Sequence, residues 1–374
     1  MSGLKILRTI LLALAILGVS SIGEFGKAAE PPALARLSGP EKERVAKLIA
    51  GAKKEGELVA YSGSWRPDVQ AKMIPLFREE YGISDAELKF KIISTRTGAI
   101  VTKITEELRA KVYKTDVVNN GTVGWFNDLI EKNELMAYDC PEYKYFSPLV
   151  ADPRIAAAHP PYFIATKITP YGIAYNPKDI KGEIVHWKDV LRPEYKGKIC
   201  GADVSKSFSY TDAYLALRKV TGKKFFEDLG KLKPFVMVSA SDLINKSISS
   251  EYPLVVMASE NVAFRTNQKG AGLKIVLPPE GWAGVGFPTV ILARAPHPNA
   301  SKLFMDFIHG KACQDLFLNF AGDVVGRLGL KSKYEGFPQP IYDLKGMIEM
   351  DWRKVTDNDR NEAREEFRKL VIGE

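Results

Sequence analysis

Cysteine and histidine are scarce in this chain of 374 residues, which has three of the former and four of the latter. Cys140, Cys200 and Cys313 lie far apart and form no CxxC pair, so the sequence excludes a disulfide framework and the common zinc patterns. At most one disulfide could form among them. No second histidine stands at metal-ligand spacing from a first, and we therefore expect neither a metal site nor a cofactor.

Motifs of covalent catalysis and of nucleotide binding are also missing. The chain has no GxSxG turn for a nucleophilic serine and no phosphate loop that ends in Gly-Lys-Ser or Gly-Lys-Thr. Gly281, Gly284 and Gly286 lie in a proline-rich turn, which is unlike a dinucleotide fold. We predict no catalytic residues and a protein that is not an enzyme. A secreted enzyme on the same scaffold is the alternative.

Clusters of one charge sign are absent, although the net charge is +8. The 53 Lys and Arg residues are spread along the chain, with no run of five or six and no basic segment interleaved with aromatic residues. This pattern disfavours nucleic acid as a partner. The basic balance still favours small anionic partners over cationic ones.

Apolar runs long enough to cross a bilayer are missing as well. The run Ile10 to Val19 is about half the roughly twenty residues that a spanning helix needs. Lys5 and Arg8 precede it and small residues follow it, which is typical of a secretory signal, and we assign residues 1–29 to that signal peptide. No cysteine follows for lipid attachment. We expect a soluble mature protein in the periplasm.

What the sequence does contain is two series of short apolar strands that alternate with amphipathic helices, which predicts an α/β fold. Two crossings, near residues 166–177 and 273–287, join the series. We expect residues 30–170 and 286–374 to form lobe 1 and residues 171–285 to form lobe 2. The strands are expected at residues 58–61, 88–94, 116–118, 169–175, 197–201, 235–237, 254–257, 273–277 and 289–292.

Polar turns follow these strands, at the edge where ligands bind in open α/β sheets. Backbone N–H groups at the helix starts and the guanidinium of Arg96 suit a carboxylate or phosphate, although the hydroxyls could equally cap helices. Trp65 could pack an apolar part of the ligand or belong to the core. The candidate binding residues are Ser62, Ser64, Trp65, Arg96, Thr97 and Thr122 in lobe 1, and Ser207, Tyr210, Thr211, Glu260 and Asn261 in lobe 2.

Six segments in a fixed order resemble a known family over about residues 45 to 325. They are residues 58–63 (LVAYSG), 97–99 (TGA), 174–177 (AYNP), 187–191 (WKDVL), 195–199 (YKGKI) and 295–308 (APHPNASKLFMDFI). They are similar to the extracellular solute-binding proteins of ABC importers, in the ferric-iron, thiamine, sugar-phosphate and phosphonate group. The resemblance implies a type II periplasmic-binding fold, with two α/β lobes, a two-strand hinge and a ligand cleft. It also implies two partners, a small-molecule solute and an ABC permease in the inner membrane, and we expect a monomer.

One departure from that family bears on the ligand. Ferric-iron members carry adjacent tyrosines as phenolate ligands, and this chain has no adjacent tyrosine pair. Glu260 alone cannot supply the anionic oxygens that Fe(III) needs, and Glu260 and Asn261 could instead meet an amine or hydroxyl, or cap a helix. We therefore predict a small organic anion (a carboxylate, a phosphonate or a sugar phosphate) as the solute. Ferric iron is the alternative.

Overall fold

The computed structural model describes residues 30–146, 158–343 and 345–374. The predicted signal peptide, residues 1–29, lies outside the described residues. Across the described ranges, no helix combines the length and the apolar character that a membrane crossing requires.

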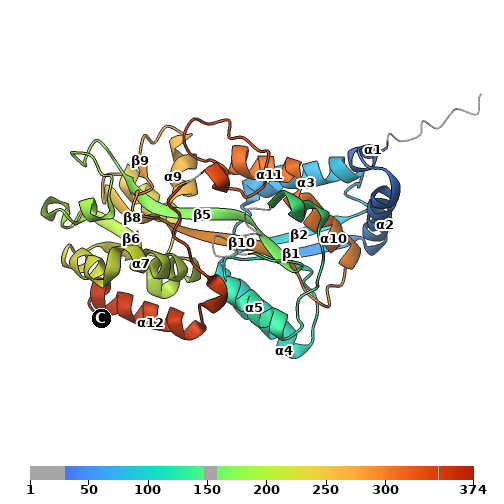
Figure 1. The fold of residues 1–374 in the computed structure, drawn as a ribbon, viewed down its shortest axis with the longest axis horizontal. Helices are drawn as coiled ribbons and strands as arrows, with labels where there is room; N and C mark the ends of the chain where they lie inside the picture. The colour runs from blue at the N-terminus through green and yellow to red at the C-terminus, as the bar shows by residue number, and fades with distance from the viewer. Residues whose placement is uncertain (1–29, 147–157, 344) are drawn as a thin grey trace, which may run out of the picture.

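A single mixed sheet runs through the molecule in the strand order β2-β1-β3-β10-β5-β8-β6-β7, with β4 and β9 paired to β5. The first three strands are parallel to one another, as are β8, β6 and β7 at the other end. β5 and β10 lie between these groups and pair antiparallel with each other and with both neighbours. Figure 1 shows these two strands connecting the two ends of the molecule. We call the elements around β2-β1-β3 the first half and those around β8-β6-β7 the second half.

The first half consists of βα units as the sequence predicts. Helix α2 illustrates the local cause: its buried side chains recur at helical spacing, and Gly56 ends it at φ 74°, a conformation that favours glycine. The strands of this half are β1 (Glu57–Ser62), β2 (Lys89–Ser94) and β3 (Val117–Asn119). The helices are α1 (Pro32–Ala35), α2 (Gly39–Glu55), α3 (Pro67–Tyr81), α4 (Thr97–Ala110), α5 (Val123–Glu131), α10 (Pro298–His309) and α11 (Lys311–Leu316).

The two connecting strands are longer than the sequence predicts. β5 covers Phe163–Tyr175 and β10 covers Ala283–Ile291, and every residue of both is buried. A strand covered on both faces has no alternation of apolar and polar residues, so its ends are hard to place from the sequence. The expected crossings at 166–177 and 273–287 coincide with β5 and with the start of β10.

The second half repeats the alternation of strands and helices. Its strands are β6 (Ile199–Ala202), β7 (Phe235–Met237), β8 (Leu254–Ser259) and β9 (Lys274–Val276). Its helices are α7 (Phe208–Lys231), which is interrupted at Gly222, α8 (Ala240–Ile248) and α9 (Glu260–Asn267). The short strand β4 (Ala158–His159) lies outside this half and pairs with the start of β5. The α/β fold class predicted from the sequence is confirmed, and the sheet as a whole is mixed.

The C-terminal helix α12 (Asp357–Phe367) packs beneath α7 of the second half (Figure 1). Arg360 of α12 donates to Asp212 of α7 across 2.8 Å, and both side chains are buried. The sequence division placed residues 286–374 in lobe 1, whereas this helix lies against α7. Its buried face includes Ala363 and Phe367, and Phe367 packs edge-on against Tyr214 of α7, while Arg360 also lies against Gly124 of α5 in the first half. The lobe boundaries stay a prediction.

Two apolar cores lie on the two sides of this arrangement. One fills the first half between α2, α3, β1 and α10, where Phe77 packs edge-on against Tyr81, Phe90 and Phe307. The larger one extends from α4 and α5 across β5 and β10 to α7. The two connecting strands are therefore anchored in packed side chains, while the strand ends between the halves are free to line a cavity.

Candidate ligand-binding cleft

A cavity of about 860 Å³ lies between the two halves, at the ends of the parallel strands. The turns after β1 and β2 and the start of α4 line it from the first half. From the second half it is lined by the start of α7, the turn after β7 and the start of α9. Residues of the two connecting strands, β5 and β10, also line the cavity, and we call this the hinge side. Of the eleven candidate residues, eight line this cavity: Ser62, Ser64, Trp65, Arg96, Thr97, Ser207, Tyr210 and Asn261.

The turn after β1 is held in place by its own hydroxyl groups. Ser62 Oγ accepts hydrogen bonds from the backbone N–H of Ser64 (3.1 Å) and of Trp65 (2.8 Å), and it donates to Asn119 Oδ1 (3.0 Å). Ser64 Oγ donates to the same Asn119 oxygen (2.6 Å). Ser62 therefore shapes the turn, and its hydroxyl has little capacity left for a ligand. The indole of Trp65 is buried and packs edge-on against Phe304, with ring centroids 5.5 Å apart.

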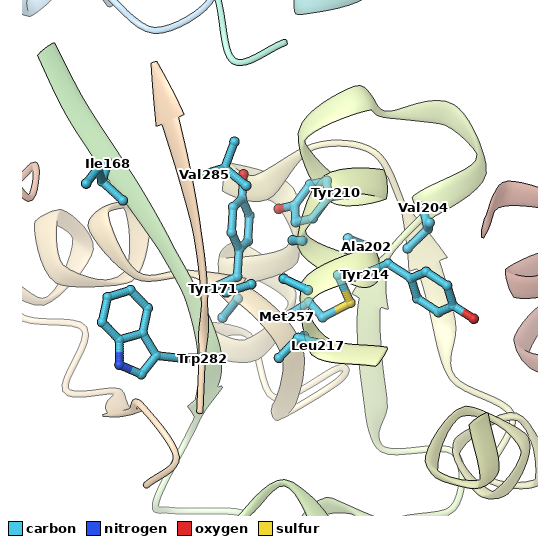
Figure 2. Packing of buried hydrophobic residues seen from close by; sticks show 14 of the residues in the cluster. Ile168, Tyr171, Ala202, Val204, Tyr210, Tyr214, Leu217, Met257, Trp282 and Val285 are labelled. Carbon is cyan, nitrogen blue, oxygen red and sulfur yellow. The ribbon is translucent and has the colours of Figure 1, made fainter. Parts of the chain in front are cut away.

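The wall of the second half is aromatic and hydroxylated. Tyr171 of β5 and Tyr210 of α7 are neighbours, as Figure 2 shows, and their rings pack edge-on with centroids 5.0 Å apart. Burial raises the pKa of Tyr171 to about 12 and that of Tyr210 well above its ordinary value. Both phenols are therefore protonated at neutral pH. The Tyr210 hydroxyl has no hydrogen-bond partner among the described residues.

Three candidates do not line the cavity, and a role for them in ligand binding stays a prediction. Thr122 is buried, and its hydroxyl donates to Asn120 Oδ1 across 3.2 Å. Thr211 lies one turn inside α7, where its hydroxyl bonds the carbonyl oxygens of Val204 and Ser207, both at 2.8 Å. Glu260 is fully buried at the start of α9. In each case the side chain is buried inside the protein.

Asn261 lines the cavity but serves as a link between elements. Its Oδ1 accepts from Ser259 Oγ (2.7 Å), and its Nδ2 donates to Asp323 Oδ1 (2.8 Å). Asp323 in turn accepts from Lys167 Nζ of β5 at 2.9 Å, and both charged side chains are buried. This chain of hydrogen bonds connects α9 of the second half to a connecting strand.

Glu260 is a buried carboxyl group without a hydrogen-bond partner among the described residues. Burial raises its pKa well above the ordinary 4.5.

This buried carboxyl group makes stability depend on pH. In the unfolded chain Glu260 ionises above about pH 4.5, whereas in the folded chain it keeps its proton, so the free energy of unfolding falls as pH rises. We expect Glu260→Gln to remove this pH-dependent decrease in the free energy of unfolding. Relative to the variant, the wild type should lose about 1.4 kcal/mol per pH unit above pH 5 until the folded carboxyl ionises, as measured by urea unfolding at pH 5, 6 and 7. An equal stability difference at all three pH values would contradict a neutral buried Glu260.

Five basic side chains line the cavity, and they fall into two groups by depth. Arg96 and Lys206 are exposed at the rim, and Lys206 lies 3.2 Å from Asp203. Arg66, Lys167 and Arg265 lie deeper, with side chains that are 30% exposed for Arg66 and 3% exposed for Lys167. No Asp, Glu or His is among the lining residues in the described part of the chain.

The three deep basic residues were missed in the sequence, although two carried a signal. Arg66 directly follows the Ser-Gly-Ser-Trp turn, and Arg265 lies four residues after Asn261, which is one helical turn. Lys167 falls inside a predicted crossing, where nothing in the sequence distinguishes a cleft-facing side chain from a surface one.

A scan against family models matched residues 116–322, more than half of the chain, to "Bacterial extracellular solute-binding protein". The chain therefore belongs to this bacterial extracellular solute-binding protein family, and the resemblance inferred from the six sequence segments is confirmed. Among curated proteins, none matches the sequence.

Solved structures of periplasmic binding proteins share the fold. AfuA from Actinobacillus pleuropneumoniae, with fructose-6-phosphate bound, is 21% identical, with a TM-score of 0.70 over 85% of this chain and 99% of that chain. Iron-bound HitA from Pseudomonas aeruginosa is 18% identical, with a TM-score of 0.62 over 85% and 98%. The spermidine/putrescine-binding protein PotD of an ABC transporter from Streptococcus pneumoniae is 17% identical, with a TM-score of 0.65 over 84% and 98%. The type II periplasmic-binding fold expected from the sequence is thereby confirmed.

Proposed function

We propose that this protein is the solute-binding component of an ABC importer, which captures a small organic anion in the cleft and delivers it to a membrane permease. The observation that carries the proposal is the composition of the cavity. Five Lys and Arg residues and thirteen hydroxyl-bearing residues are among those that line it, and no carboxylate is found among the described lining residues. Such a surface favours an anion that also carries hydroxyl or other polar groups.

The mechanism that we propose is closure of two halves on the solute. A solute that contacts turns from both halves makes its full set of interactions only when they are close together, so binding shifts the population toward the closed form. The closed form would then dock on the permease. Export through residues 1–29 and action in the periplasm are part of the same proposal.

The other ligand classes seen among the structural relatives fit this cavity less well. Within the described ranges, no group of three or more His, Cys, Asp or Glu side chains could hold a metal ion. Tyr171 and Tyr210 are held as neutral phenols by burial, which opposes phenolate ligation of Fe(III). A polyamine would meet five like charges. The fructose-6-phosphate bound to AfuA is the relative's ligand that best matches the cavity described here.

A thermal-shift panel tests the proposal. It would contain fructose 6-phosphate, methylphosphonate and succinate as anions, and fructose, spermidine and ferric citrate as controls. An anion present at a hundred times its dissociation constant should add about 2.7 kcal/mol of stability, which corresponds to a rise in Tm of about 5 °C. Stabilisation by spermidine or ferric ion, with no response to any anion, would refute the proposed ligand class.

A further inference from the structure

The three deep basic residues come from three different parts of the fold. Arg66 belongs to the turn between β1 and α3 in the first half, Lys167 to the connecting strand β5, and Arg265 to α9 in the second half. All three line the same cavity, and the positive charges of Arg66 and Arg265 are near enough to Lys167 to contribute to the lowering of its pKa. A group bound among them would therefore contact both halves and the hinge at once.

Most of their hydrogen-bond donors are free to bind a ligand. Arg66 uses one N–H for Asp68 (2.9 Å), Lys167 uses one for Asp323 (2.9 Å), and Arg265 uses one for the carbonyl oxygen of Ala321 (3.2 Å). A guanidinium carries five N–H donors and an ammonium carries three. Arg265 has no carboxylate within salt-bridge distance among the described residues.

Arg66 and Arg265 also repel each other across the cleft. Burial lowers the pKa of Arg265 to about 10, the nearby positive charge of Arg66 contributes to the lowering, and the charges of Asp323 and Asp68 oppose it only in part. The two arginines belong to opposite halves, so closing the cleft without a counter-charge increases this repulsion. An anion placed between them converts the repulsion into two attractive contacts.

We propose that Arg66, Lys167 and Arg265 form the anion subsite of the cleft, that the group they bind is a tetrahedral phosphoryl or phosphonyl dianion, and that this group bridges the two halves. The inference deepens the proposed function and rests on it. Donors that converge from three elements match the three oxygens of a tetrahedral oxyanion, whereas a planar carboxylate accepts pairs of donors in one plane. The deep position also makes each contact stronger than the same contact at the rim, because less water screens it.

This placement differs from the anchor expected from the sequence. Arg96 lies at the exposed rim, where a charge contact with a ligand is weakened by solvent. Because it lines the same cavity, Arg96 provides a comparison of depth between residues of the same type, and not a control that leaves binding unchanged.

Isothermal titration with fructose 6-phosphate, methylphosphonate, inorganic phosphate and succinate tests the subsite in four proteins: the wild type, Arg265→Met, Arg66→Met and Arg96→Met. We expect at least one phosphoryl or phosphonyl probe to bind the wild type more tightly than succinate does. Arg265→Met and Arg66→Met should each weaken that binding about 10- to 100-fold, which is the loss of a charge-assisted contact. Arg96→Met should weaken that binding less than either of the two deep variants does. Arg66→Met keeps the test valid if Arg265→Met fails to fold, because the Arg66 side chain is partly exposed and is paired with the exposed carboxylate of Asp68.

The outcomes separate the two proposals. If anions bind but Arg265→Met and Arg66→Met bind them as the wild type does, or if Arg96→Met alone loses binding, the subsite is wrong and the anion-binding function stands. The same holds if succinate binds more tightly than every phosphoryl and phosphonyl probe. If no probe binds the wild type, the subsite is overturned, and a positive response to spermidine or ferric citrate in the thermal-shift panel then overturns the proposed function as well.

Discussion

Replacing Asp212 by alanine is expected to lower the free energy of unfolding by about 3–5 kcal/mol, because it leaves the buried charge of Arg360 without its partner. The two side chains are 2% and 1% exposed, and Arg360 Nε lies 2.8 Å from Asp212 Oδ1. Burial raises the pKa of Asp212, and the charge of Arg360 opposes that rise. After the substitution, Arg360 retains the carbonyl oxygen of Val355 and a 3.6 Å contact with Asp357, whose side chain is exposed. Urea unfolding would measure the loss.

A surface pair provides the matched control for this prediction. Arg294 lies 2.8 Å from Glu134, the same separation, but the two side chains are 53% and 22% exposed. Arg294→Ala should cost about 1 kcal/mol or less. The double variant Asp212→Leu with Arg360→Met should recover most of the stability lost in Asp212→Ala, since an apolar pair of similar size avoids the desolvation of two charges. A cost for Asp212→Ala as small as that for Arg294→Ala would contradict the buried contact between α12 and α7.

Replacing Asp323 by alanine should have an effect of similar size, about 3–5 kcal/mol, at the hinge. Lys167 of β5 and Asp323 are 3% and 2% exposed and 2.9 Å apart. Burial already lowers the pKa of Lys167, and Asp323 is the largest opposing influence. Without Asp323 the lysine is an unpaired buried cation, and the amide of Asn261 loses its acceptor.

Lys167→Met distinguishes this explanation from simple loss of packing. The methionine keeps the apolar part of the side chain, and Asp323 keeps the hydrogen bond from Asn261 Nδ2 (2.8 Å). We therefore expect Lys167→Met to cost less stability than Asp323→Ala, with both measured by urea unfolding. A larger stability cost for Lys167→Met than for Asp323→Ala would contradict this explanation, because it would show that the unpaired aspartate is more destabilising than the unpaired lysine.

Local patterns in the sequence predicted much of this fold. The buried residues of α2 recur at helical spacing, and the strand-end turns at Ser62 and Thr97 are marked by small and hydroxylated residues. Such signals depend on neighbours within one or two turns of chain, which is why they are readable without a structure. Within each half the parallel strands present their carboxyl ends at one edge. The two edges face each other because the two groups run in opposite directions along the connecting strands, where β3 ends opposite Thr289 and β8 ends opposite Tyr171.

The direction in which a side chain points could not be predicted in the same way. Thr211 and Glu260 stand beside residues that line the cavity, yet they turn into the protein because each lies on the inner face of its helix. The pairs Lys167–Asp323 and Asp212–Arg360 join residues 156 and 148 positions apart, and nothing local marks them. Arg265 was missed for a related reason, since its depth depends on how α9 packs against the connecting strands.

Hydrogen exchange measured with and without the tightest-binding anion of the panel tests the central claim most directly. We predict simultaneous protection in residues 62–67 and 94–99 of the first half and in residues 207–210 and 259–265 of the second half, because both sets line the one cavity. Protection confined to one half would contradict a solute held between the two halves. So would protection around the separate cavity of about 460 Å³ that is lined by Arg36, Arg44 and Lys311.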